Sequence, residues 1–143
     1  MYIEPGLEEL VHNLLGSLQP NMATMMGIEF SKLTKDECVA TMPVNEATVQ
    51  PFRMLHGGAS VALAETLGSV AANFCVDGEG YCVGLEINAN HVRSVRSGFV
   101  IGITKPIHLG VSTQVWQIDI KDERKRLVCT SRLTMAVKKN KKG

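Results

Sequence analysis

The sequence predicts an α+β protein in which an antiparallel sheet wraps around one long central helix. Residues 58–76 form a helical stretch that is apolar on almost every face and carries a single charge, Glu65. A helix of that kind is normally buried in a core. Short runs typical of strands lie before and after this stretch, and strands segregated from one helix along the chain favour an α+β architecture.

Residues 5–19 predict a first, amphipathic helix. Its apolar side chains recur at the spacing of one helix face. Pro5 suits the first helical turn, and the sequence Gln19-Pro20-Asn21 is expected to end the helix. The apolar positions are Leu7, Leu10, Val11, Leu14, Leu15 and Leu18.

Two strands are expected before the central helix and four after it. The first two are predicted over residues 28–33 and 38–42, where apolar and polar residues alternate. Residues 108–110 fit a bulge or a turn, and residues 122–125 fit a hairpin turn. The four later strands are predicted over residues 81–92, 99–106, 111–119 and 126–137.

Length and composition indicate one domain. The chain has 143 residues, of which 45% are apolar and 20% are charged, as in ordinary globular proteins. We expect a single domain over residues 1–137 and a disordered basic tail over residues 138–143. The formal net charge of +1 argues against a nucleic-acid-binding protein, which usually carries a clear basic excess.

The sequence carries no signal for a membrane or for secretion. No apolar run reaches the ~20 residues of a membrane span, and the N-terminus lacks the basic start and apolar block of a signal peptide. The four cysteines show no Cys-x-x-Cys spacing and lie in apolar surroundings, so we expect reduced core thiols in a cytoplasmic protein. They are Cys38, Cys75, Cys82 and Cys129.

Glu65 is the first candidate for chemistry. At about 100° per residue, it shares a helix face with the small residues Gly58, Ala62, Ser69 and Ala72, which let a ligand or another backbone come close. Ser69 lies one turn after Glu65, so its hydroxyl and the carboxylate can reach one water or one substrate atom. The alternative is a solvated surface glutamate, the commonest place for a lone carboxylate on a helix.

The sequence His56-Gly57-Gly58 marks the expected start of the central helix. The first N–H groups of a helix lack partners and carry partial positive charge, so they stabilise developing anions. A carboxylate two turns further along then suits acyl transfer, in which one group attacks or activates water and the other holds the oxyanion. The alternatives are a simple turn at the two glycines and a capping role for His56.

Three blocks of sequence resemble the hotdog-fold acyl-CoA thioesterases. They read QPFRMLHGGASVALAETLGS at residues 50–69, VGLEINANHVRS at 83–94, and KPIHLG at 105–110 followed by QVWQI. The similarity spans residues 22–137. It is closest to the branch that includes the Arthrobacter-type 4-hydroxybenzoyl-CoA thioesterase and the 1,4-dihydroxy-2-naphthoyl-CoA thioesterase of menaquinone synthesis.

The resemblance implies a hotdog fold and an enzyme that hydrolyses acyl-CoA thioesters, aryl-CoA above all, to a free acid and CoA. Glu65 matches the family's catalytic carboxylate, which acts as nucleophile or general base. The N–H of Gly57 matches the donor that polarises the thioester carbonyl, and His56 and Gln50 match groups that orient the thioester. Ser69 matches a position that can hold the hydrolytic water; a hydroxyl bonded back to the preceding turn is an equal alternative.

The resemblance also implies where CoA binds. Arg93 and Arg96 suit its phosphates, because a guanidinium binds oxyanions through two hydrogen bonds. Arg53 stands where close relatives often carry glycine, and Val111-Ser112-Thr113 stands where relatives often carry a more basic stretch. The implied substrate-binding residues are Phe52, Gly84, His91, Val92, Arg93, Ser94, His108, Leu109, Gly110, Ser112 and Thr113.

The family implies an assembly of several copies and no separate cofactor. Members are at least homodimers with the site at the subunit interface, and often tetramers of two dimers, so we expect a homodimer at least and a homotetramer as the full assembly. CoA is part of the substrate. We expect no metal, because the histidines His12, His56, His91 and His108 show no ligand spacing.

Two other functions remain open at this point. One is a hotdog hydratase or dehydratase, a group that has a His-Phe-Pro-Gly signature before its helix; here His56 is followed directly by two glycines. The other is a non-catalytic module that binds acyl-CoA. Such a module needs contacts to CoA but no charge at Glu65, so the glutamate favours an enzyme.

Overall fold

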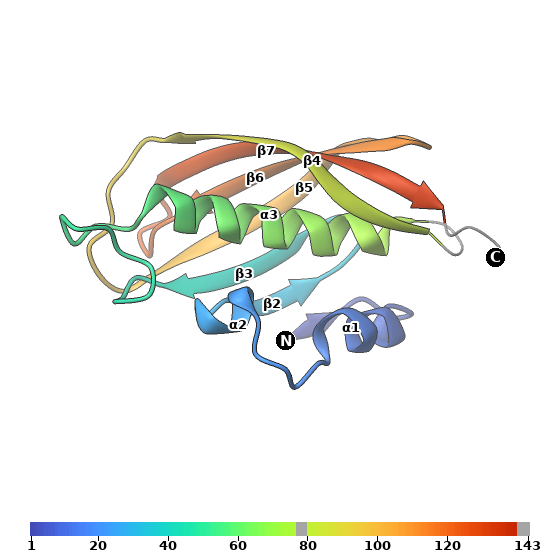
Figure 1. Ribbon diagram of the computed structural model, residues 1–143, viewed down its shortest axis with the longest axis horizontal. Coiled ribbons are helices and arrows are strands. Elements are labelled where there is room, and N and C mark those ends of the chain that lie inside the picture. Colours follow the sequence, from blue (N-terminus) through green and yellow to red (C-terminus); the bar gives the residue numbers. More distant parts are fainter. Residues whose placement is uncertain (77–79, 140–143) are drawn as a thin grey trace.

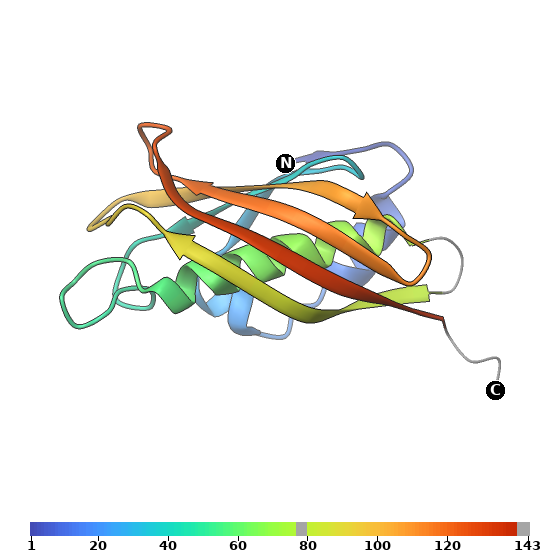
Figure 2. The same cartoon turned by 90° about the horizontal axis from the view of Figure 1, so that it is seen from above.

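The computed structural model describes residues 1–76 and 80–139 of the chain. In these residues, a curved sheet of seven strands wraps around the long helix α3 (Gly57–Phe74), as Figure 1 and Figure 2 show. Two short helices precede it, α1 (Glu8–Leu15) and α2 (Met22–Met25). The strands are β1 (Tyr2–Ile3), β2 (Glu29–Leu33), β3 (Cys38–Pro43), β4 (Gly80–His91), β5 (Phe99–Leu109), β6 (Thr113–Lys121) and β7 (Leu127–Lys139).

The strands follow the order β1-β2-β3-β5-β6-β7-β4 across the sheet. β1 pairs with β2 in parallel, and the other neighbouring pairs of described strands are antiparallel. The prediction of an α+β fold, with an antiparallel sheet around one long helix, is confirmed. The irregularity predicted near residue 108 is a bulge, since the pairing of β5 with β6 shifts between Pro106 and His108.

One face of α3 forms the core with the inner face of the sheet. Leu63, Leu67 and Phe74 of α3 are buried together with Trp116 of β6 and Leu133 of β7. The residues of β6 alternate strictly between buried and half-buried, which is the period of a strand with one face on a core. Burial of each large apolar side chain contributes roughly 1.5–3 kcal/mol, so this face fixes the helix on the sheet.

The chain's own sheet leaves the opposite face of α3 open. Gly58 is exposed there, and Ala62, Glu65 and Ser69 are only half-buried. β4 runs beside this face as the last strand of the sheet, and no other strand within residues 1–76 and 80–139 pairs with its outer edge. The predicted site residues on α3 lie along this open face.

The first helix is shorter than predicted. It covers Glu8–Leu15 rather than residues 5–19, because Gly6 has a φ of +96°, which lies outside the right-handed helical region. At the other end, Gly16 closes the helix by donating its N–H to the carbonyl of His12 at 2.8 Å. The helical spacing of apolar residues therefore predicted a helix that is too long at both ends.

Two short elements near the N-terminus were not predicted. β1 adds two residues to one edge of the sheet. α2 begins at a capping box, in which the Asn21 side chain accepts the N–H of Thr24 at 3.1 Å and the Thr24 hydroxyl accepts the N–H of Asn21 at 3.0 Å. The Asn-x-x-Thr spacing in the sequence is typical of a helix start. Asn21, which was expected only to end the first helix, therefore begins α2.

All six predicted strands are present, with ends shifted by a few residues. The clearest correction concerns the segment 138–143, predicted as a disordered tail. Lys138 and Lys139 belong to β7, where Lys139 pairs with Gly80 of β4. Residues 140–143 of that segment lie outside the described residues.

The four cysteines are free thiols. Cys38, Cys82 and Cys129 are buried, and Cys75 at the end of α3 is half-buried. Burial raises the pKa of Cys38 and of Cys75 to about 11. Since the thiolate is the reactive form of cysteine, these two thiols stay protonated and inert near neutral pH.

Candidate active site

The mouth of α3 holds an unpaired backbone donor. His56 caps the helix, and its Nδ1 accepts the N–H of Gly58 at 2.7 Å. The carbonyl of His56 accepts the N–H groups of Ala59 and Ser60. Within the described residues the N–H of Gly57 takes part in no hydrogen bond, so it is available to an anion at the positive end of the helix dipole.

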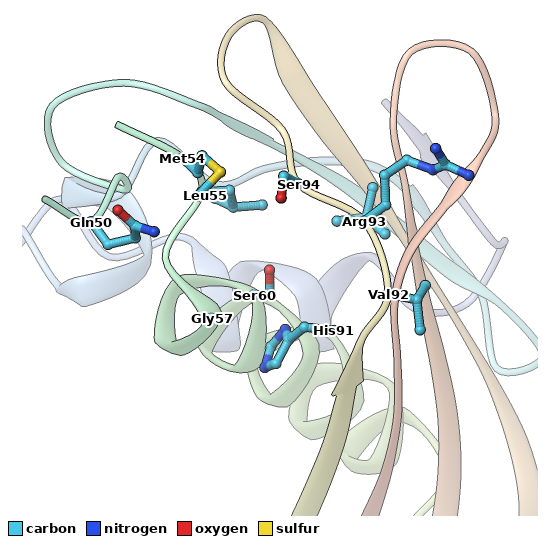
Figure 3. A pocket seen from close by; sticks show the side chains of 10 residues that line it. Gln50, Met54, Leu55, Gly57, Ser60, His91, Val92, Arg93 and Ser94 are labelled. Atoms are coloured by element: carbon cyan, nitrogen blue, oxygen red, sulfur yellow. The ribbon is translucent and has the colours of Figure 1, made fainter. Parts of the chain in front are cut away.

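His91, at the end of β4, lies directly against Gly57. A Cβ atom at position 57 would lie 3.0 Å from Nε2 of His91, so a glycine here lets the imidazole approach the backbone closely. Figure 3 shows the ring of His91 beside the first turn of α3. A free N–H and an imidazole therefore share one small volume.

A cavity of about 290 Å³ opens at this helix mouth (Figure 3). It is formed by the loop before α3, the first turn of α3 and the segment after β4. Ser60 and Val128 also line it and were not predicted; Ser60 was readable, because it lies one helical turn after Gly57. Six residues predicted for the site meet in this cavity: Gln50, Gly57, His91, Val92, Arg93 and Ser94.

Gln50 is held by the turn that it starts. Its Oε1 accepts the N–H of Phe52, and its carbonyl accepts the N–H of Arg53 at 2.8 Å. With Oε1 bonded in this way, the side-chain NH2 is the donor that Gln50 offers to the cavity. Phe52, predicted to bind substrate, is 78% exposed at the tip of the turn and does not line the cavity.

Arg53 adopts a left-handed backbone conformation in the same turn. Its φ is +65°, where a residue with a Cβ atom loses roughly 1–2 kcal/mol and glycine loses almost nothing. Its guanidinium pairs with Glu46, and both side chains are exposed. An exposed ion pair offsets little of that strain, so the position suits the glycine that relatives often carry.

We expect Arg53→Gly to raise the free energy of unfolding by about 0.5–1 kcal/mol, because relief of the backbone strain outweighs the extra chain entropy of glycine. Chemical denaturation measures the change. Arg53→Ala is the control, since it removes the same ion pair but keeps a Cβ atom at the strained φ. Equal free energies of unfolding for the two variants would show that the positive φ at position 53 causes no strain.

Glu65 lies two turns further along the open face of α3. It is half-buried, and a Cβ atom on Gly84 of β4 would lie 2.6 Å from its Oε1, so glycine at position 84 leaves room for the carboxylate. Glu65 makes no ion pair with any described residue. A sheltered and unpaired carboxylate is unusual for a structural residue and suits a nucleophile or a base.

Ser69 lies one helical turn after Glu65, on the same open face of α3. Its hydroxyl donates to Sδ of Met135 at 3.9 Å, rather than to the preceding turn of its own helix. Met135 is fully buried in β7 and was not predicted for the site. Its sulfur would also lie 3.9 Å from a Cβ atom on Gly84, so it forms the floor beneath the glutamate and the serine.

Gly57 and Glu65 are too far apart to act on one atom within one chain. Glu65 comes eight positions after Gly57 on α3, so their Cα atoms are about 12 Å apart along the helix axis at 1.5 Å per residue. Reacting groups must come within about 3–3.5 Å of the carbonyl that they attack or polarise. One chain therefore presents the predicted oxyanion donor and the predicted carboxylate as two separate half-sites.

The third group of predicted residues, His108 to Thr113, lies at the opposite end of α3. Leu109 and Gly110 line a cavity of about 510 Å³ together with Cys75, which caps the C-terminal end of the helix. The His91–Ser94 segment lies at the other end, beside Gly57. The two segments implied to bind CoA are therefore not brought together in one chain.

Two features are not found in the part of the chain that the structure describes. No helix there is both long enough and apolar enough to cross a membrane. No group of three or more histidine, cysteine, aspartate or glutamate side chains there is arranged to hold a metal ion.

The sheet wrapped around a single long helix defines a hotdog protein, and the comparisons with known proteins give its family. The family model for the thioesterase superfamily matches residues 52–129, which is more than half of the chain. The chain belongs to the thioesterase superfamily. The predictions of a hotdog fold and of a thioesterase are thereby confirmed.

Individual relatives agree with this membership. The 1,4-dihydroxy-2-naphthoyl-CoA hydrolase of Escherichia coli (strain K12) is 58% identical over 117 residues, which cover 82% of this chain and 86% of that protein. The crystal structure of a thioesterase from Haemophilus influenzae has a TM-score of 0.80 and 50% identity, and the match covers 92% of this chain and 87% of that one.

A thioesterase from Staphylococcus aureus has been solved as two alanine variants. In one the substituted residue is a glutamate; this structure has a TM-score of 0.80 and 37% identity, covering 82% of this chain and 98% of that one. In the other it is a glutamine. The two substituted positions are separated by the same number of residues as Gln50 and Glu65 in this chain.

Proposed function

We propose that this protein hydrolyses aryl-CoA thioesters, such as 1,4-dihydroxy-2-naphthoyl-CoA or hydroxybenzoyl-CoA, to a free acid and CoA. The observation that carries the proposal is Glu65, a half-buried carboxylate without an ion-pair partner among the described residues, for which Gly84 leaves room. The superfamily and the Escherichia coli relative support the thioester and the aryl group. The spacing shared with the Staphylococcus aureus variants supports Gln50 and Glu65 as site residues.

Glu65 has two chemical routes to the same products. As a nucleophile, one carboxylate oxygen attacks the thioester carbonyl, the C–S bond breaks, CoA leaves as the thiolate, and water then hydrolyses the acyl–glutamyl anhydride. As a general base, Glu65 takes a proton from water while the water oxygen attacks the carbonyl; the tetrahedral intermediate then collapses, the C–S bond breaks, and CoA leaves as the thiolate, which takes up the proton. Neither route needs a metal or a separate cofactor, because CoA arrives as part of the substrate.

The other site residues act on the carbonyl and on the water. In both routes the carbonyl oxygen becomes negative in the transition state, and the Gly57 N–H donates to it. The side-chain NH2 of Gln50 and the imidazole of His56 orient the thioester. The hydroxyl of Ser69, one turn from Glu65, holds the hydrolytic water.

We propose that two copies of the chain share each site. Because Gly57 and Glu65 of one chain lie about 12 Å apart, a thioester carbonyl held by one Gly57 meets the Glu65 of a partner subunit. A two-fold axis across the open face of α3 makes two such sites, and the small residues on that face let two helices approach. Leu85 on β4, the strand beside that face, is 60% exposed, and an apolar side chain exposed there supports an interface. We propose that two such dimers form a tetramer.

Mixing two inactive variants tests the shared site. Glu65→Gln and Gly57→Pro each disable both sites of their own dimer, but a mixed dimer has one intact site, with Gly57 from one copy and Glu65 from the other. Refolding equal amounts together should restore about a quarter of wild-type thiol release, because half of the dimers are mixed and each holds one intact site. Activity no higher than that of either variant alone would contradict the shared site.

Thiol release from a panel of CoA thioesters tests the activity itself. Hydroxynaphthoyl, hydroxybenzoyl, phenylacetyl and straight-chain acyl groups form the panel, and we expect the fastest release from an aryl member. Binding of CoA without release from any member would favour the non-catalytic module. Addition of water to an enoyl-CoA would instead favour the hydratase.

We also propose that the protein works in the cytoplasm. Its four cysteines are free thiols, and three of them are buried. Proteins that act in oxidising compartments often pair their cysteines, whereas cytoplasmic proteins keep them reduced. Fractionation of cells followed by detection of the protein tests this location, and recovery outside the cytoplasm would contradict it.

A further inference from the structure

A second hollow opens at the mouth of α3. It measures about 600 Å³ and lies between α2, residues 47–49 and the first turn of α3; Figure 1 shows α2 near the start of α3. Three methionines, Met22, Met25 and Met26, line it. Met22 and Met25 are 66% and 71% exposed, so the hollow presents apolar surface for which the fold of one chain supplies no cover.

His56 is the only ionisable side chain among the described residues that line this hollow. Its Nδ1 accepts the N–H of Gly58 at 2.7 Å, so the neutral ring carries its proton on Nε2. The hydroxyl of Thr48, the other polar side chain of the lining, already donates to the carbonyl of Pro43 at 2.7 Å. The hollow therefore offers one hydrogen-bond donor on an otherwise apolar surface.

The methionine hollow and the cavity beside His91 lie on opposite faces of the first turn of α3. Gly57 and Ser60 line the cavity, as does Arg93, whereas Gly58 and Ala59 line the hollow. At about 100° per residue, these two pairs point to opposite sides of the helix. The free N–H of Gly57 lies between a polar compartment and an apolar one.

A CoA thioester has two arms that differ in the same way. The CoA arm ends in phosphates, far from the thioester carbonyl, and they suit the side of α3 on which the exposed Arg93 extends away from the helix mouth (Figure 3). The acyl arm leaves the same carbonyl carbon in another direction and carries no phosphate. When the carbonyl oxygen accepts the Gly57 N–H, the polar side therefore suits the CoA arm and the apolar methionine hollow suits the acyl arm.

We infer that the methionine hollow binds the acyl group of the substrate and that it is built for an aromatic ring. This inference rests on the proposed function. Methionine sulfur makes favourable contacts with the edges of aromatic rings, and its flexible side chain adapts to rings of different size. The volume lies within the range of about 300–1,000 Å³ of small-molecule pockets.

Substitutions in the hollow test the inference. The double variant Met22→Ala/Met25→Ala should lower kcat/KM for benzoyl-CoA and hydroxynaphthoyl-CoA about 10-fold relative to acetyl-CoA, which has no ring to lose these contacts. Ala47→Trp should lower the same ratio because the indole fills the hollow. Leu18→Ala is the matched control. Leu18 comes four positions before Met22 and is also exposed, but it does not line the hollow, so this variant should leave the ratio unchanged.

An unchanged ratio in both the double variant and Ala47→Trp would overturn the inference. A smaller assembly mass for the double variant in light scattering would also overturn it, because the hollow would then be a contact between subunits. Release of no thiol by the wild type from any thioester would instead overturn the proposed function. Calorimetry with a ketone analogue of benzoyl-CoA then decides the inference: about 10-fold weaker binding by the double variant supports it, and equal binding overturns it.

Discussion

Glu65→Gln is expected to lower kcat for thiol release by at least about 10³-fold. The amide has nearly the shape of the carboxylate, but it neither attacks a carbonyl nor takes a proton from water. The fold should tolerate the change, because Glu65 makes no ion pair within the described residues. We therefore expect the loss in kcat, with KM and the free energy of unfolding almost unchanged.

Glu86→Gln is the matched control for this variant. Glu86 lies on β4, two positions after Gly84, and is exposed, so the same chemical change there should leave turnover unaffected. Steady-state thiol release gives kcat and KM, and titration with a non-hydrolysable ketone analogue gives binding. Wild-type kcat in Glu65→Gln would remove the carboxylate from the chemistry and the proposed mechanism with it.

The central helix and its glutamate were predictable because both signals are local. One charge in an apolar stretch of this length is visible in the sequence, and helical geometry places Glu65 on a face of small residues. The neighbour that makes room for it was not predictable from local physics. Gly84 meets Glu65 because β4 pairs with β7 in a register that shifts between Gly84 and Glu86, and register depends on the whole sheet.

The sequence also did not predict that the two CoA-binding segments lie at opposite ends of α3. The resemblance groups His91–Ser94 with His108–Thr113 as residues that bind CoA. The topology places the first segment at the mouth of α3 and the second beside Cys75 at its other end. Alternation of apolar and polar residues predicts that strands exist. It does not predict which strand ends lie next to each other, or which residues a partner subunit contributes to the site.

Gly57→Pro is expected to lower kcat by about 10²–10³-fold by deleting one hydrogen-bond donor. Gly57 is the first helical residue of α3, a position that tolerates proline well because its N–H has no partner within the helix. His56 has φ −67° and ψ 131°, a conformation that the residue before a proline favours. The helix should therefore form in the variant while the oxyanion loses its donor.

Gly57→Ala separates the lost donor from crowding. Both variants place a Cβ atom about 3.0 Å from Nε2 of His91, so both push the imidazole, but only proline removes the N–H. Circular dichroism and thermal unfolding check that both fold, and the ratio of their kcat values then measures the replacement of the N–H by the Cδ atom of proline. Equal kcat values would mean that displacement of His91 limits the reaction and that another group holds the oxyanion. A ratio near 10²–10³ would assign that role to the helix mouth, since the crowding of His91 by Cβ is common to both variants.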